Sequence, residues 1–265
     1  MALTMQILIL VLLPTVFLLP PRAEAGEIIG GRKANPHSRP YMAYLEILRG
    51  NRRSHCGGFL VAENFVLTAA HCNGEDITVL LAAHNVRRDE ETQQRVSVQH
   101  KIPHPGYNKT SRENDLMLLH LVEPAELIDA VDTIPLPQAG QAVEPGSMCS
   151  VAGWGRTSPK TKTNILHEVE LEVMSDEICQ NLRCYGPVMM MCVGDPNQDK
   201  ASFSGDSGGP LVCDRTAQGI VSFGKKNGSP SRVFTRVSAY VPWIERKMRG
   251  LRSPGPHVER LGPLH

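Results

Sequence analysis

Three polar residues stand where nucleophilic chemistry would need them. Ser207 lies in "FSGDSGGPLVC", His71 ends the run "VLTAAH", and Asp115 precedes the apolar run "LMLLHL". A serine hydroxyl is a weak nucleophile at its own pKa, so it needs a base and an acid that orients the base. Singly, each residue has an ordinary explanation: a turn serine, a structural histidine and a strand-end aspartate. Their order and their separations of 44 and 92 residues predict one nucleophilic site.

The elements that must position these residues are short strands. The 265 residues include 23 glycines and 20 prolines, which punctuate short apolar runs such as "YMAYLEIL" and "GFLVAENFVLTAA". This pattern predicts an all-β protein with one large or two small domains. The net charge of +1 and the pI near 7.7 give no electrostatic argument for binding nucleic acid or a membrane surface.

The N-terminus has the pattern of a secretory signal. An apolar run of 14 residues, Ile7 to Pro20, is too short to span a bilayer, and Ala23 and Ala25 fit a small-x-small cleavage site. We predict that residues 1–25 are a signal peptide, although no Lys or Arg precedes the run. The alternative is an N-terminal core segment.

Secretion allows the cysteines to form disulfides. There are seven: Cys56, Cys72, Cys149, Cys179, Cys184, Cys192 and Cys213. No two CxxC pairs occur, so we expect no metal site. Because seven is odd, at least one thiol is free or bonded outside the chain, and the sequence alone does not pair the others.

The motifs together resemble the chymotrypsin-like serine proteases. The order His, Asp, Ser is theirs and differs from the orders in subtilisin and the α/β-hydrolases. The likeness covers nearly all of residues 28–249 and includes "IIGG", "CGGFL", "SVAGWGR", "GDSGGPLVC" and "VFTRVSAYVPWI". It implies two packed antiparallel six-stranded β-barrels, residues 28–137 and 138–249, with a C-terminal helix, a cleft between the barrels and no cofactor.

The resemblance also implies roles. Ser207 would be the nucleophile, His71 the general base and acid, and Asp115 the residue that orients His71. The N–H groups of Gly205 and Ser207 would form the oxyanion hole. Asp206 would pair with the amino group created when the chain is cut before Ile28, so the uncut chain would be nearly inactive.

Several features resemble the granule proteases: granzymes, cathepsin G and mast-cell chymases. After a cut at Ala25, only Gly26 and Glu27 precede Ile28, which matches the activation dipeptide that a dipeptidyl peptidase removes in that group. The resemblance implies storage in the secretory granule of an immune cell, then release, with protein substrates, serpin-type inhibitors and an acidic proteoglycan as partners of a monomer. The disulfides it implies are Cys56–Cys72, Cys149–Cys213 and Cys179–Cys192.

The resemblance places the pocket for the residue before the cleaved bond (P1). Its expected lining is Ala201, Ser204, Ser222, Phe223, Gly224 and Arg232. Ala201 stands where trypsin-like relatives have aspartate, so a basic P1 side chain would find no counter-charge. Arg232 would favour Asp or Glu, unless it faces solvent or pairs with Asp195 or Asp199. The alternatives are chymase-like specificity for Phe, Leu or Met, with Phe203 or Phe223 in the pocket, and a catalytically silent antimicrobial or binding relative.

Three features stay outside this scheme. Cys184 has no partner and is either a buried inert thiol or an exposed one. Residues 250–265, rich in Pro and Gly, are predicted to be a disordered tail open to trimming. Asn108 begins the sequon Asn-Lys-Thr in an expected surface loop and is a predicted glycosylation site.

Overall fold

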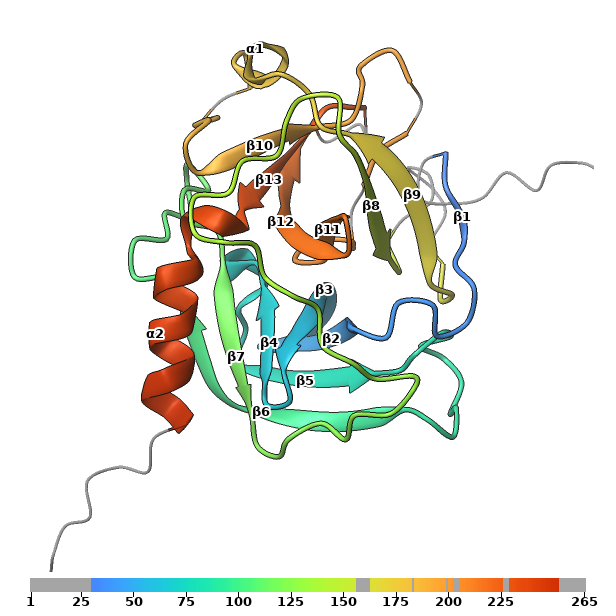
Figure 1. The fold of residues 1–265 in the computed structure, drawn as a ribbon. Helices are drawn as coiled ribbons and strands as arrows, with labels where there is room; N and C mark the ends of the chain where they lie inside the picture. Colours follow the sequence, from blue (N-terminus) through green and yellow to red (C-terminus); the bar gives the residue numbers. More distant parts are fainter. Residues whose placement is uncertain are drawn as a thin grey trace, which may run out of the picture.

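The first half of the chain forms a closed barrel. The computed structural model describes residues 30–155, 163–182, 184–198, 200–202, 205–225 and 229–252. The barrel strands, in spatial order, are β2 (Met42–Arg49), β3 (Arg52–Ala62), β4 (Phe65–Thr68), β7 (Met117–Leu121), β6 (Gln94–Pro103) and β5 (Asp76–Leu81) (Figure 1). All neighbours in the barrel are antiparallel.

The second half forms a seven-stranded sheet. Its order is β1 (Arg32–Lys33), β9 (His167–Glu172), β8 (Met148–Gly153), β11 (Pro210–Cys213), β12 (Thr216–Gly224), β13 (Arg232–Arg236) and β10 (Met190–Val193). The ends of this order approach each other: Val193 of β10 forms an isolated antiparallel bridge with Val173, next to β9, and the N–H of Gly194 donates to the carbonyl of Glu172 in β9 at 2.8 Å. The structure therefore has one closed six-stranded barrel and a second, seven-stranded sheet in which β1 lies outside β9. The all-β chymotrypsin-like fold is confirmed.

Both ends of the described chain cross to the other half. β1 pairs with β9, whereas helix α2 (Val241–Arg252) runs along the first barrel (Figure 1). Trp243 and Ile244 of α2 are buried in the core that the first barrel supplies. These two crossings bind the halves together, and the division at residues 137 and 138 stays a prediction.

The helix is longer than expected at its C-terminal end. It ends at Arg252, so residues 250–252 of the predicted tail are helical. The reason is packing, since Met248 and Leu251 lie partly buried against the first core. Residues 253–265 lie outside the described residues, as do the predicted signal peptide, Gly26, Glu27 and Ile28.

The three implied disulfides are present. Their Cα–Cα distances are 6.2 Å for Cys56–Cys72, 4.5 Å for Cys149–Cys213 and 5.7 Å for Cys179–Cys192. The last joins β10 to the short helix α1 (Asp176–Cys179). Cys184 is unpaired and exposed, so the buried-thiol alternative is wrong.

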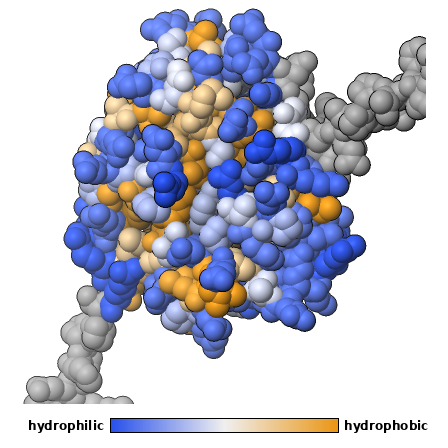
Figure 2. Space-filling view, turned by 45° about the vertical axis from the view of Figure 1, so that its right-hand side comes forward, coloured by the Kyte–Doolittle hydropathy of each residue, from blue (hydrophilic) through white to orange (hydrophobic). Residues whose placement is uncertain are grey.

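The face of the molecule in Figure 2 is mostly hydrophilic, with hydrophobic patches between polar residues. Only six large hydrophobic residues among those described are exposed, and Val188, at 77%, is the most exposed of them. Within the same described part of the chain, no helix is long and apolar enough to cross a membrane.

Candidate active site

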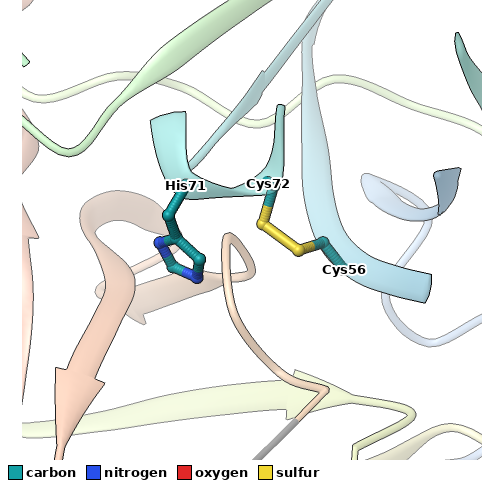
Figure 3. A group of neighbouring side chains, drawn as sticks. All are labelled: Cys56, His71 and Cys72. Carbon is teal, nitrogen blue, oxygen red and sulfur yellow. A yellow bond between two sulfur atoms is a disulfide. The ribbon is translucent and has the colours of Figure 1, made fainter. Parts of the chain in front are cut away.

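His71 sits in a short turn that is fastened to the barrel. The 3-10 turn η1 (Ala70–Cys72) follows the buried strand β4 almost directly. Figure 3 shows His71 beside Cys72, whose disulfide reaches Cys56 on β3. Ala69 and Ala70 are buried, and their small side chains let the turn lie close to the core. The turn is therefore held on both sides, while the His71 side chain stays 15% exposed.

The carboxylate of Asp115 makes two contacts with His71. One carboxylate oxygen, Oδ1, accepts the backbone N–H of His71 at 2.9 Å, and the other, Oδ2, lies 2.7 Å from the ring Nδ1. A carboxylate at this position accepts a hydrogen bond from Nδ1–H, which leaves Nε2 available to take a proton. The side chain of Asp115 is completely buried, so water does not compete for these contacts.

The second half of the molecule completes the environment of Asp115. Ser222 on β12 donates from its Oγ to Oδ2 at 2.5 Å, and Thr235 on β13 donates to the Asp115 carbonyl at 3.0 Å. Burial by itself would raise the pKa of Asp115, but the hydrogen bonds and charge of His71 and the bond from Ser222 hold its pKa below the ordinary value. The carboxylate is therefore ionised at neutral pH.

The loop that carries Ser207 belongs to the second half of the molecule and lies beside the turn that carries His71. This loop precedes β11, and the Ser207 carbonyl accepts the N–H of Gly57 at 2.8 Å and lies 3.7 Å from Cys72 Sγ. Gly208 makes this approach possible: its φ is +82°, and a Cβ there would lie 2.2 Å from Thr68 Oγ1. The loop is thus docked beside the turn that carries His71. Among the described contacts, no hydrogen bond joins the Ser207 hydroxyl to His71; such contacts commonly tighten only around a substrate.

Asp206 lies in a cradle of glycines. It is completely buried, and Oδ1 accepts the N–H of Gly155 at 2.9 Å. A Cβ at Gly153 or Gly155 would lie 2.2 or 2.4 Å from Oδ1, so these positions exclude side chains. Ile28, the expected partner of this carboxylate, is outside the described residues.

Arg232, one of the residues predicted to line the P1 pocket, is buried. It is 7% exposed, and its Nη1 donates to the Lys225 carbonyl at 2.7 Å. Gly224 gives it space, since a Cβ there would lie 2.6 Å from Arg232 Cδ. Burial lowers the pKa of the guanidinium, and the charge of Asp206 opposes this. The solvent-facing alternative is therefore wrong.

The structure describes some of the other predicted pocket residues and not the rest. Ala201 is completely buried, and Phe223 is partly buried against Cys192 and Val233. Phe203, Ser204 and Asp199 lie outside the described residues. The Asp195 carboxylate accepts hydrogen bonds from Asn197 and Gln198.

A cavity of about 560 Å³ is lined by residues of β2, β3 and β5 and of the segment around Trp154. His55, Trp154 and Gly155 are among its lining residues, and a Cβ at Gly205 would lie 2.8 Å from His55 Nε2. Nothing in the sequence identified His55, because no local pattern marks a strand residue that lies close to Gly205, 150 positions away in the chain. The hydroxyl contacts of Ser222 and Thr235 with Asp115 were missed for the same reason.

One group of side chains has the spacing of metal ligands but not their chemistry. Cys56, His71 and Cys72 have ligand atoms within 4.8 Å of one another. Both sulfurs belong to one disulfide, however, and a thiolate is the form that binds a metal ion. This trio is therefore a structural contact.

Comparisons with known proteins agree with this fold and site. A family model, Trypsin, matches residues 28–244. Human cathepsin G is 51% identical over 249 residues, covering 94% of this chain and 96% of that protein. Human granzyme B is 52% identical over 242 residues, covering 90% and 98%. A solved structure described as GrC has a TM-score of 0.81 at 51% identity, covering 84% of this chain and all of the other. The chain belongs to the trypsin family of serine endopeptidases, among relatives that include the granule proteases.

Proposed function

We propose that the protein cleaves peptide bonds through an acyl-enzyme formed on Ser207. The observation that carries this is the double contact of the buried Asp115 with His71, beside the docked loop of Ser207. His71 Nε2 takes the hydroxyl proton as Ser207 Oγ attacks the carbonyl carbon, and it later gives that proton to the leaving amine. In the second half of the reaction, His71 takes a proton from a water molecule that attacks the acyl carbon, and it returns that proton to Ser207 Oγ as the acid product leaves.

Two further groups serve the transition state in this proposal. The N–H groups of Gly205 and Ser207 stabilise the negative oxygen of the tetrahedral intermediate. The ionised Asp115 stabilises the imidazolium that His71 becomes. Loss of this carboxylate costs about ten thousand-fold in turnover in the best-studied relative, and we expect a similar loss here.

The proposed specificity is for Asp or Glu at P1. Its support is that Arg232 is buried and that the predicted pocket floor, Ala201, carries no charge. A charge-assisted contact in such a pocket contributes about 1.5–3 kcal/mol, or roughly ten- to a hundred-fold in discrimination. Chymase-like specificity remains the rival, since Phe223 pairs with Val233, the residue next to Arg232 on β13.

The test uses protein that begins at Ile28 and a peptide library varied at P1. Wild type should prefer Asp and Glu, Ser207→Ala should be inactive, and Arg232→Glu should shift preference toward basic or aromatic residues. Arg246→Glu, which makes the same charge change on the exposed face of α2, is the control. A preference for Phe or Leu that Arg232→Glu leaves unchanged would refute the acidic specificity, and an inactive wild type would favour the silent binding relative.

We also propose that activation depends on Ile28 and Asp206. A new amino group at Ile28 would neutralise the buried Asp206 carboxylate and order the adjacent oxyanion hole. Protein beginning at Gly26 should therefore show less than about 1% of the turnover of protein beginning at Ile28, since a lost buried ion pair costs about 3–5 kcal/mol. Equal turnover of the two forms would contradict this.

The proposed storage, activation and control of the protein rest on its similarity to the granule proteases. We propose storage in an immune-cell granule, activation by a dipeptidyl peptidase, later release, and control by serpin-type inhibitors. Arg246, Lys247 and Arg249 form an exposed cationic face on α2 that suits an acidic proteoglycan. Asn108 is exposed, and we propose that it carries a glycan, which glycosidase treatment and mass spectrometry would reveal.

A further inference from the structure

A third charged group lies next to the His71–Asp115 pair. Arg112 Nη1 is 3.7 Å from Asp115 Oδ2, the same oxygen that contacts His71 Nδ1 and receives the Ser222 hydrogen bond. The side chain of Arg112 is 34% exposed, so the pair is only partly screened by water.

The loop before β7 directs Arg112 inward. Its φ of +61° is in the left-handed region, which a residue other than glycine seldom adopts. Its N–H donates to the Asn108 carbonyl at 2.8 Å, which closes a turn around residues 108–112. Nη1 is buried, and the guanidinium interacts with the Tyr107 hydroxyl as well as with the Asp115 carboxylate, so both groups help to compensate its desolvation.

The two tyrosines around Asp115 stay neutral near neutral pH. Burial, followed by the charge of Asp115, raises the pKa of the Tyr107 and Tyr240 hydroxyls, and the charge and hydrogen bond of Arg112 only partly oppose this at Tyr107. Glu113 lies farther out, exposed and near Tyr240. From β2, Arg49 donates from Nη2 to the His71 carbonyl at 2.8 Å and is a second, more exposed cation. Arg112 is the cation that shares the Asp115 oxygen with His71.

We infer that Arg112 is a positioning residue that extends the activity of the enzyme to lower pH by opposing protonation of His71 through Asp115. The inference rests on the proposed function. Two cations that share one carboxylate repel each other, so the imidazolium is less stable with Arg112 present. The neutral imidazole, which is the form that accepts the Ser207 proton, therefore persists to lower pH.

The experiment is a pH profile of kcat/KM between pH 5 and 9 for protein beginning at Ile28. In Arg112→Gln, the acid limb should move to higher pH by about half a unit, as expected for loss of a charge several ångströms away across a partly hydrated gap. Arg112→Lys should restore at least half of the shift. Lys109→Gln, which removes an exposed cation from the same loop without a contact to Asp115, should leave the limb unchanged.

Controls separate this effect from damage to the loop and from substrate contact. Arg112→Gly accepts the positive φ without strain, so it should show the same shift as Arg112→Gln. An unmoved limb in both variants overturns the inference, as does a change confined to KM, which would make Arg112 a substrate contact. Retention of activity in Ser207→Ala would instead overturn the proposed function, so the two failures are distinguishable.

Discussion

Asp115 is completely buried and is nevertheless an acceptor for several groups at once. His71 binds both of its oxygens, Ser222 donates to one of them, and Arg112 lies within ion-pair distance of that same oxygen. Each contact favours the ionised form and so offsets the cost of burying the charge. Because Ser222 comes from the second half of the molecule, the alignment of His71 depends on the docking of the two halves.

Removal of the Ser222 hydroxyl tests this dependence. Ser222→Ala takes away a hydrogen bond to a buried carboxylate, which is expected to lower the free energy of unfolding by about 1.5–3 kcal/mol. We expect kcat to fall by roughly three- to tenfold, since a less firmly held Asp115 orients His71 less well. Denaturant unfolding and steady-state kinetics measure the two effects. Ser97→Ala, an exposed position on β6, serves as control, and a Ser222 variant with wild-type kcat would contradict the prediction.

His104, in the loop after β6, packs against aromatic residues at the start of helix α2. The ring of His104 lies 5.3 Å from that of Tyr240 and 5.0 Å from that of Trp243. Burial lowers the pKa of His104, and burial also lowers the pKa values of His84 and His120. The unfolded chain therefore binds protons more readily than the folded one as pH falls through the range of histidine.

This linkage predicts lower stability in acid. The contribution of a histidine with a depressed pKa is complete above its unfolded value, about 6.5, and is lost as pH falls through the folded value. We expect Tm to be a few degrees lower at pH 5.0 than at pH 7.5. His104→Gln should reduce that difference, whereas Ser97→Ala, at an exposed position, should leave it unchanged. A Tm that rises on acidification would count against this account, and differential scanning calorimetry provides the measurement.

At the scale of the whole molecule, the two halves are held together by chain ends that cross. β1 pairs with β9, and α2 buries Trp243 and Ile244 against the first barrel. Each of these side chains contributes about 1.5–3 kcal/mol by burial, which is a large part of the 5–15 kcal/mol typical of a folded protein. The helix is therefore part of the first core, although its sequence follows the second sheet.

Truncation distinguishes the helix from the segment after it. Protein that ends at Tyr240 lacks α2 and should fail to fold or should aggregate. Protein that ends at Arg252 should keep its Tm within about 2 °C and its full activity, because α2 is complete. All proteins begin at Ile28, and thermal unfolding and peptide hydrolysis compare the two with residues 28–265; a stable, active protein ending at Tyr240 would show that the helix is dispensable.

The sequence by itself determined the strand-rich class of fold, the segments that carry His71, Asp115 and Ser207, and, through its motifs, the family. These depend on local patterns: glycines and prolines between short apolar runs, and glycines around Ser207 that permit a backbone path a side chain would block. Only the tertiary structure decided that Arg232 is buried, that Ser222 and Arg112 converge on Asp115, and that β1 and α2 cross between the halves. Contacts of this kind join residues that packing brings together, such as Ser222 and Asp115, which are 107 positions apart, and no local pattern records which partners will meet.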